Sequence, residues 1–293
     1  MINQIAAIVA PLFLIVGVGY FYGVRAKPVM GTINKLIMDI FVPALIFSVM
    51  IRDDFYPSQY VALIIGGAIV MLGSGLLAFV LARAVGFPWR AMVPTAMFSN
   101  WANLGVPLYV FTLGDIALGG GVMLVVLGNV LCFTIGTYIY SGKLNGFEVL
   151  RTPVLIAVLL GGFINLINYS VPQLLTIPID MLGQVAIPLM LFSLGVRLTG
   201  VSWNDSAVGL LMAVFCPIAG VLMALLAIQV LPMSELHKNI LILFGVLPPA
   251  VVNFMLAEQY NSEPEKVASA VMIGNLLSVL SIPLLLFFVL ADT

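Results

Sequence analysis

The chain has 293 residues, of which 62% are hydrophobic and only 8% are charged, and its formal net charge at pH 7 is −1. Soluble domains normally carry about 25% charged residues, so this composition predicts a protein that lies mostly in lipid. The net charge excludes the basic stripe that a nucleic-acid partner would require. The two isolated cysteines, Cys132 and Cys216, fit neither a disulfide framework nor a metal site.

Apolar stretches of spanning length follow one another along the chain, because a bilayer core needs about 20 residues of helix. They are predicted at residues 5–24, 34–51, 60–82, 90–113, 118–140, 152–168, 179–198, 207–231, 238–260 and 266–290. No basic residue precedes the first stretch, so no cleavable signal peptide is expected. The pattern predicts an all-α integral membrane protein with ten transmembrane helices.

Basic residues gather on one side of this predicted arrangement. If the N-terminus lies outside, one side holds only Arg52 and Lys238. The other side holds Arg25, Lys27, Lys35, Arg83, Arg90, Lys143, Arg151, Arg197 and Lys266. Cytoplasmic loops carry an excess of basic residues, so we expect a multi-pass protein of the plasma (inner) membrane with both termini on the periplasmic side.

An internal repeat relates the two halves of the chain. The matched segments are Pro43-x-x-x-Phe47-Ser48 with Pro188-x-x-x-Phe192-Ser193, and Gly128-Asn129 with Gly274-Asn275. Arg52 and Arg197 each stand nine residues after the proline of their motif. Each half has an odd number of spans, so the second copy is predicted to be inverted. The predicted units are a first repeat at 1–140, a short cytoplasmic connector at 141–151 and an inverted repeat at 152–293. Inverted repeats are typical of secondary carriers, which hold substrate between the halves near the midplane.

Two stretches at corresponding places in the repeats contain residues that interrupt a helix. These residues are Asn100, Asn103, Gly105 and Pro107 in the fourth stretch and Pro248, Pro249 and Asn253 in the ninth. Proline removes an amide donor and crowds the preceding turn. A break creates a new helix N-terminus, whose partial positive charge favours an anion. We therefore predict that these residues form a substrate site. The alternative is a pair of proline kinks in which the asparagines join helices by hydrogen bonds.

Further polar residues within the stretches have two interpretations each. Asn129 and Asn275 occupy equivalent positions and could bind substrate or a cation, or could join helices by hydrogen bonds. Asp39 and Arg197 are predicted to pair near the cytoplasmic face, with ordinary interfacial placement as the alternative. Asp39 and Glu258 could couple transport to protons. His237, the only histidine, is expected to be exposed in a loop.

Several segments resemble the auxin efflux carrier family. They are Asn100-x4-Gly105-Val106-Pro107-Leu108, Pro248-Pro249-Ala250-Val251-Val252-Asn253-Phe254, Ala257-Glu258-Gln259-Tyr260-Asn261, Ile33-Asn34-Lys35 leading to Pro43, and Phe192-Ser193-Leu194-Gly195. The short connector is similar to that of the compact bacterial members, which are associated with malonate, malate and similar carboxylates.

The resemblance implies two inverted five-helix repeats in which the broken fourth and ninth helices cross, as in sodium–proton antiporters and bile-acid symporters. It implies a scaffold of helices 1, 2, 6 and 7 (5–51 and 152–198). Helices 3–5 and 8–10 (60–140 and 207–290) would form a transport domain that moves as an elevator. Asn100 is then expected to contact the substrate carboxylate. A homodimer is a further expectation, because elevator scaffolds commonly dimerise.

The leading hypothesis is a secondary transporter of small organic anions, either carboxylates such as malonate or malate, or auxin-like aromatic acids. It needs no cofactor or metal, although a proton or a sodium ion could drive it. The expected partners are the carboxylate substrate and the lipid bilayer. A membrane channel and a transporter-derived sensor that binds the same anions are the alternatives. An enzyme is disfavoured because the chain offers no nucleophile–base pair and no metal-binding motif.

Overall fold

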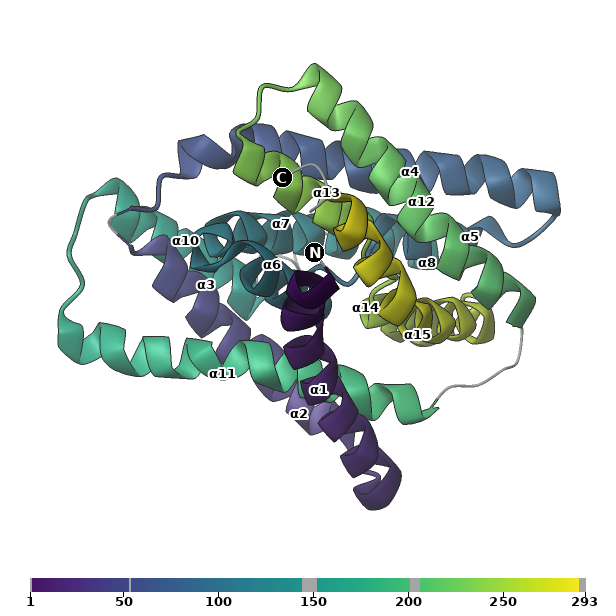
Figure 1. Ribbon diagram of the computed structural model, residues 1–293, viewed down its shortest axis with the longest axis horizontal. Helices are drawn as coiled ribbons and strands as arrows, with labels where there is room; N and C mark the ends of the chain where they lie inside the picture. The colour runs from purple at the N-terminus through teal and green to yellow at the C-terminus, as the bar shows by residue number, and fades with distance from the viewer. Residues whose placement is uncertain (1, 53, 144–151, 201–205, 290–293) are drawn as a thin grey trace.

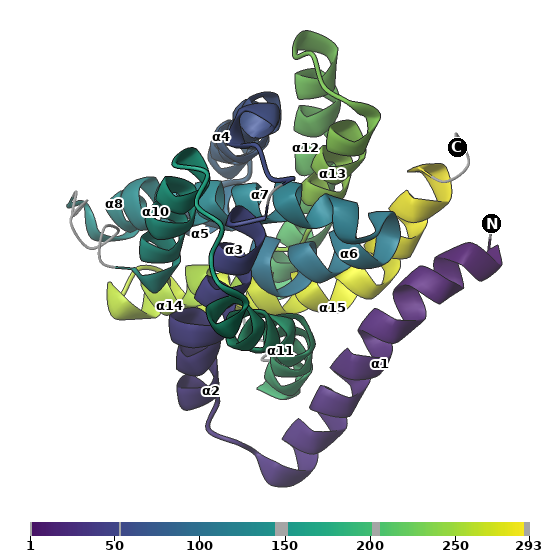
Figure 2. The same cartoon turned by 90° about the vertical axis from the view of Figure 1, so that its left-hand side faces the viewer.

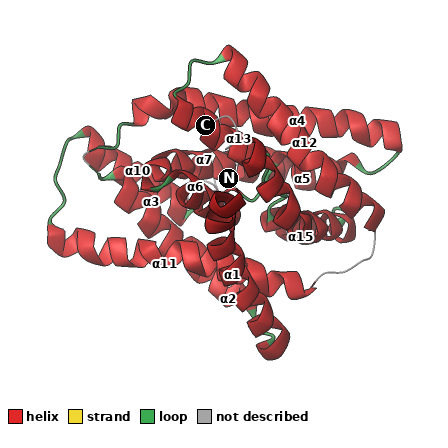
Figure 3. Ribbon diagram, in the orientation of Figure 1, coloured by secondary structure: helices red, strands yellow, loops and turns green. Residues whose placement is uncertain are grey.

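The computed structural model describes residues 2–52, 54–143, 152–200 and 206–289. The described residues form helices joined by loops, and no strand occurs among them (Figure 3). Most of the predicted connector, residues 144–151 including Arg151, lies outside the described residues, as does the end of the predicted second repeat at 290–293.

The first half of the chain folds into helices that are mostly apolar along their whole length (Figure 1). They are α1 (Ile2–Ala26), α2 (Met30–Leu36), α3 (Val42–Met50), α4 (Val61–Val85), α5 (Trp89–Met97), α6 (Val106–Leu113), α7 (Leu118–Leu131) and α8 (Thr137–Ser141). Three wide π-helical turns lie among these helices. Turn η1 (Ile37–Phe41) connects α2 to α3, and η3 (Trp101–Gly105) leads into α6. Turn η5 (Cys132–Gly136) connects α7 to α8. Short 3-10 turns, η2 (Pro57–Tyr60) and η4 (Asp115–Ala117), precede α4 and α7.

The second half contains longer helices and one interrupted segment. Its elements are α10 (Pro153–Leu166), α11 (Gln173–Arg197), η6 (Leu198–Gly200), α12 (Ser206–Val230), α13 (Glu235–Gly245), α14 (Val251–Gln259) and α15 (Pro264–Val289). Among the described residues, seven helical segments are long and apolar enough to cross a membrane, and Trp101–Leu113 and Pro153–Leu166 are shorter apolar segments. The predicted class, an all-α membrane protein, is confirmed. The count of ten spans and the inverted repeat stay predictions.

One group of helices is held together by close backbone contacts. Helix α1 packs on α11, and α3 packs on both α10 and α11. At the α1–α11 contact, a Cβ on Gly19 would overlap the carbonyl oxygen of Phe192, and one on Gly195 would overlap that of Val16. Glycine is therefore required at both positions, because the two backbones touch. We call α1, α2, α3, α10 and α11 the α11 group. Figure 2 shows α1 and α2 on the same side of the molecule as α11.

The remaining helices pack around α12, which contacts α4, α13 and α15. We call α4 to α8 and α12 to α15 the α12 group. Helices α4 and α11 lie at opposite edges of the molecule in Figure 1. The outward side of α12 exposes large apolar side chains, such as Ile218 at 60% and Leu222 at 53%. Lipid tails suit these surfaces, since they carry no polar groups that need water.

Proline alone does not interrupt the helices of this protein. Pro11, Pro188, Pro217 and Pro283 all lie inside helices that continue past them. Transmembrane helices tolerate proline where neighbouring helices and local adjustments satisfy the freed carbonyl groups. The interruptions described next therefore need a further cause, and that cause is the way in which two segments meet.

Candidate functional site

Two interrupted segments meet near the centre of the molecule. Helix α5 ends at Met97 and α13 ends at Gly245, and residues that belong to no helix follow both ends. Ser99 and Pro249 face each other as an isolated antiparallel pair. Next to them, the backbone N–H of Asn100 donates to the carbonyl of Pro248 at 2.7 Å. Both predicted interruptions are present, and they cross each other; we call this contact the crossing.

The crossing exchanges hydrogen bonds between the two segments. Besides the bond from Asn100, the N–H of Ala250 donates to the carbonyl of Phe98 at 2.8 Å. The side chain of Asn253 donates from Nδ2 to the same Phe98 carbonyl at 2.7 Å and to that of Ala250 at 2.9 Å. Backbone groups without a partner are costly in lipid, so these bonds allow an open backbone at membrane depth. Asn253 is 0% exposed and therefore serves the crossing rather than a solute.

Asn275 joins α15 to the crossing. Its Nδ2 donates to the carbonyls of Pro249 at 2.9 Å and Val271 at 2.7 Å, and its Oδ1 accepts from Asn100 Nδ2 at 3.0 Å. Asn275 is 3% exposed. The alternative interpretation of this residue, a hydrogen bond between helices, is the one that the geometry supports.

A cavity of about 480 Å³, which we call the inner cavity, lies beside the crossing. Its wall includes residues of the α11 group on one side and of the α12 group on the other. The lining residues are Gly31, Asn34, Lys35, Ile37, Met38, Asp39, Thr152, Pro153, Val154 and Arg197 from the first group, and Asn100, Trp101, Ala102, Asn103, Asn129, Phe133, Ala250, Val251, Val252 and Met255 from the second. Drug-sized ligands typically occupy pockets of roughly 300–1,000 Å³, so this cavity has room for a small organic molecule.

All three wide turns border the inner cavity. Turn η1 contributes Ile37, Met38 and Asp39, η3 contributes Trp101 to Asn103, and η5 contributes Phe133. Such turns are rare and often occur at functional sites. Their shared location marks this cavity as the main candidate site.

Three charged side chains line the inner cavity: Lys35, Asp39 and Arg197. The predicted ion pair between Asp39 and Arg197 is wrong, since no described carboxylate forms an ion pair with Arg197. The repeat predicted how far along their helices these two residues lie, but it did not predict the direction in which their side chains point. Each of them lines the cavity instead. The cavity wall thus carries two cations and one carboxylate.

The predicted substrate residues divide into two sets. Asn100, Asn103 and Asn129 line the inner cavity, with Asn129 Nδ2 bonded to the Val125 carbonyl of its own helix at 2.8 Å. The residues that do not line it are Gly105, Pro107, Pro248, Pro249 and Asn253. The prolines at 248 and 249 belong to the crossing. A Cβ on Gly105 would lie 2.9 Å from Leu247 Cδ1, so this glycine allows close packing. Pro107 is the second residue of α6, which follows η3 without a break.

The residues considered for coupling divide in the same way. Asp39 and Arg197 line the inner cavity, whereas Asn275 is part of the crossing. Glu258 is exposed in the last turn of α14 and does not line the cavity.

Sequence reasoning missed two residues of the cavity wall. Lys35 was counted for orientation and, together with Asn34, as part of a motif, but neither residue was assigned to the site. Asn34 Oδ1 accepts a hydrogen bond from Ser193 Oγ at 2.8 Å, which ties α2 to the C-terminal part of α11. The spacing of Lys35 and Asp39 could have revealed this wall, because residues four apart share one helical face.

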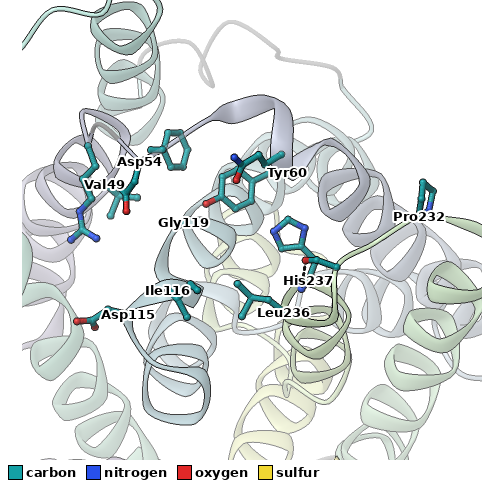
Figure 4. A pocket seen from close by; sticks show the side chains of 13 residues that line it. Val49, Asp54, Tyr60, Asp115, Ile116, Gly119, Pro232, Leu236 and His237 are labelled. Carbon is teal, nitrogen blue, oxygen red and sulfur yellow. Dashed lines mark hydrogen bonds between the residues drawn. The ribbon is translucent and has the colours of Figure 1, made fainter.

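A second cavity of about 500 Å³, the outer cavity, lies at the other end of the α2–α3 segment (Figure 4). His237 lines it, and here the sequence prediction of an exposed loop residue is wrong. His237 lies in the first turn of α13, is 9% exposed, and packs its ring on Tyr60 with centroids 5.3 Å apart. Contact with an aromatic residue distant in the sequence could not be predicted from the local pattern.

Comparisons with known proteins agree with this architecture. Residues 142–286 match a family described as membrane transport protein. An uncharacterized transporter of Methanocaldococcus jannaschii is 23% identical over 304 residues, covering 94% of this chain and 96% of the relative. An uncharacterized transporter of Methanothermobacter thermautotrophicus is 27% identical over 295 residues, covering 94% of this chain and 95% of the relative.

Proposed function

The chain belongs to the membrane transport protein family, which includes the auxin efflux carriers that its motifs resemble, and from this premise we propose that it is a secondary carrier of small organic anions. The family and the transporter relatives indicate a transporter rather than an enzyme. The observation that carries the proposal is the inner cavity beside the crossing, whose charged lining has an excess of cations.

The polar groups of the inner cavity suit a negative solute. Lys35 and Arg197 outnumber Asp39, so the cavity attracts anions. Val251 and Val252 line it from the start of α14, where the first backbone amides have no partner within the helix and carry partial positive charge. No side chain caps this helix. An anion here would therefore interact with both side-chain and backbone donors.

Asn103 adds an amide that is free to bind a solute. Its Oδ1 is buried and has no hydrogen-bond partner in the described part of the chain. Rotation of the amide by 180° replaces this acceptor by the Nδ2 donor, so the same side chain can serve either a hydroxyl group or a carboxylate. Asn253 Oδ1 is also buried without a partner among the described residues, but of these two residues only Asn103 lines the inner cavity, which supports a role of Asn103 in binding.

The apolar part of the wall favours an organic anion over an inorganic one. Trp101, Phe133, Val252 and Met255 line the cavity together with the polar groups. A hydrated phosphate or sulfate ion would gain nothing from these surfaces, whereas the carbon skeleton of an organic acid would lose its contact with water. The proposed substrates are carboxylates such as malonate or malate, or auxin-like aromatic acids.

The proposed mechanism is alternating access of the elevator type. Its support is the position of the inner cavity between the α11 group and the α12 group. In this proposal the α11 group is the scaffold (5–51 and 152–198), and the α12 group is the transport domain (60–140 and 207–290). The inverted repeat of ten spans, the plasma-membrane location with periplasmic termini, and a homodimer formed through the scaffold belong to the same proposal.

The experiment is counterflow in proteoliposomes. Vesicles that contain the purified protein are preloaded with unlabelled malonate, malate or an aromatic acid, and uptake of the labelled acid is followed. A carrier shows faster labelled uptake when preloaded, because loaded carriers return faster, whereas a channel does not. Absence of counterflow with all three acids, at imposed proton and sodium gradients, would contradict the proposed function.

A further inference from the structure

The two repeat-related arginines lie at different cavities. Arg197 ends α11 and lines the inner cavity, and Arg52 follows α3 and lines the outer cavity. Each stands nine residues after the proline of its motif, in Pro43-x-x-x-Phe47-Ser48 or in Pro188-x-x-x-Phe192-Ser193. One wall of both cavities is the α2–α3 segment. Lys35 and Arg52 stand at its two ends, roughly 25 Å apart at 1.5 Å per residue, which is close to the thickness of a bilayer core.

The outer cavity, like the inner one, is shared by the two groups of helices. Phe55, in the loop after α3, is fixed to α10 by a hydrogen bond from Asn165 Nδ2 to its carbonyl at 2.8 Å. Its ring stacks on Tyr60 of the α12 group with centroids 5.2 Å apart, and Tyr60 packs on His237. Figure 4 shows the side chains of Tyr60 and His237 on one side of the cavity and Asp54 and Asp115 on the other. A movement of one group against the other would therefore open or close this cavity as well.

We propose that the outer cavity is a second anion-binding site, in which Arg52 attracts the substrate carboxylate from that face as Arg197 does from the other face. This inference rests on the proposed function, because the ligand of both cavities is the same organic anion. When the α12 group moves toward the outer side, the crossing would approach Arg52 and leave Arg197. The two arginines would then act in alternation on one solute.

The guanidinium of Arg52 is available for this role. Arg52 is exposed, and no described carboxylate forms an ion pair with it. The carboxylates that face it are Asp54 and Asp115 in the outer cavity and Asp180 in an adjoining hollow. Gln59 and Ser234 add neutral polar groups to the wall.

The charge balance distinguishes the two cavities. The inner wall has two cations and one carboxylate, whereas the outer wall has Arg52 with Asp54 and Asp115. Opposite charges near a binding site raise the local concentration of a charged ligand, and like charges lower it. We therefore expect the wild-type protein to have a higher half-saturating concentration (KM) for an anion that arrives from the Arg52 face.

The test measures KM separately from each face, with labelled malonate in right-side-out and inside-out membrane vesicles. Arg52→Gln should raise KM from the Arg52 face by about threefold, the size expected for one partly screened charge, and should leave KM from the other face nearly unchanged. Arg197→Gln should raise KM from the other face and leave KM from the Arg52 face nearly unchanged. Arg52→Lys should retain most of the wild-type behaviour. Asp115→Asn should lower KM from the Arg52 face, because it removes a repelling charge.

The matched control is Lys238→Gln. Lys238 is a cation on the same face, but it pairs with Glu235 at 2.7 Å and does not line the outer cavity. Its replacement should change neither KM. If wild-type vesicles transport malonate but Arg52→Gln and Asp115→Asn leave the ratio of the two KM values unchanged, this inference is wrong and the proposed function stands. If Arg52→Gln fails to fold, Asp115→Asn alone decides. Absence of wild-type transport of all three acids would instead overturn the proposed function.

Discussion

Two pairs of segments from distant parts of the chain cross at close range, and they do so in different ways. Helices α1 and α11 remain unbroken, and Gly19 and Gly195 let their backbones touch. At the other contact both segments open, and Asn100 and Ala250 donate backbone hydrogen bonds to the opposite segment. In the first contact both helices continue unbroken, even past their internal prolines, and in the second the two segments exchange backbone hydrogen bonds.

The difference shows how a membrane protein can place a polar site at depth. A close helix contact needs only small residues, and it leaves no backbone group for a solute. An opened segment costs free energy in lipid unless another segment provides partners. At the crossing, the segment that provides these partners leads directly into α14, and the first residue of α14, Val251, lines the inner cavity. We therefore expect substitutions of residues that line the inner cavity to change transport, and substitutions of residues that only hold the backbone together, at the crossing or at the α1–α11 contact, to change stability.

The largest effect is expected from Asn100→Ala. This change removes a cavity-lining amide and the hydrogen bond from Nδ2 to Asn275, but keeps the backbone bond to Pro248. Counterflow should fall about tenfold or more, which corresponds to ~1.4 kcal/mol of lost interaction. The measurement is the initial rate in proteoliposomes, with melting temperature as the control for folding. A wild-type rate would remove Asn100 from the site.

A smaller effect, on stability, is expected from Asn253→Ala. Its Nδ2 bonds to the carbonyls of Phe98 and Ala250 would be lost, although each carbonyl keeps a backbone N–H partner, so the loss is that of ordinary hydrogen bonds at about 0.5–1.5 kcal/mol each. The melting temperature should fall while KM stays near the wild-type value. Asn129→Ala is the comparison, because Asn129 lines the cavity and bonds only within its own helix. It should raise KM and leave the melting temperature nearly unchanged. The same pattern in both variants would remove the distinction between crossing and cavity.

The α1–α11 contact offers a matched pair in one helix. A Cβ at position 19 would overlap the carbonyl of Phe192, whereas a Cβ at Gly17 would meet nothing within 4 Å. Gly19→Ala should destabilise the protein by about 1–2 kcal/mol, because the helices must separate. Gly17→Ala should be neutral or stabilise it by up to ~1 kcal/mol through helix propensity. Thermal unfolding in detergent measures both. Equal melting temperatures would show that the two helices are not in backbone contact.

The smallest effect is expected from Lys35→Gln. Lys35 lines the inner cavity but is exposed, so its charge is partly screened. KM from that face should rise about twofold, and the dependence of KM on salt up to roughly 0.3 M should weaken. The control is Lys27→Gln, a cation of the same predicted face that does not line the cavity. Equal changes in the two variants would mean that Lys35 acts only through the overall surface charge.

The sequence was sufficient to predict where the backbone opens. Asn100 places a polar amide in an apolar stretch, and Pro248 and Pro249 lack backbone N–H donors. Both signals are visible in the local sequence. The roles of Asn253 and Asn275 could not be separated from that of Asn100, because all three are asparagines in apolar helices. Which of these asparagines faces a backbone carbonyl and which faces the inner cavity depends on how the two segments meet at the crossing.

The errors share one cause, which is that the rotation of a side chain about its helix depends on tertiary contacts. Asp39 lies in a wide turn, and the turn alters which way the following residues point. Pro43 has no N–H to donate to the Asp39 carbonyl, which signals an irregular turn but not the direction of the Asp39 side chain, so the predicted pair with Arg197 failed. His237 was placed in a loop because the ninth apolar stretch was predicted to begin at residue 238, yet α13 begins at Glu235 and the His237 ring packs on Tyr60.

The wide turns that border the inner cavity have a mechanical consequence. A π turn holds one residue more than the α-helical turn that it replaces. Turns η1 and η5 could narrow or widen by passing this extra residue along the helix, while the crossing stays fixed by its shared bonds. The inner cavity would then have one rigid end and compliant sides, which would suit the proposed carrier if its organic acids differ in width but share a carboxylate.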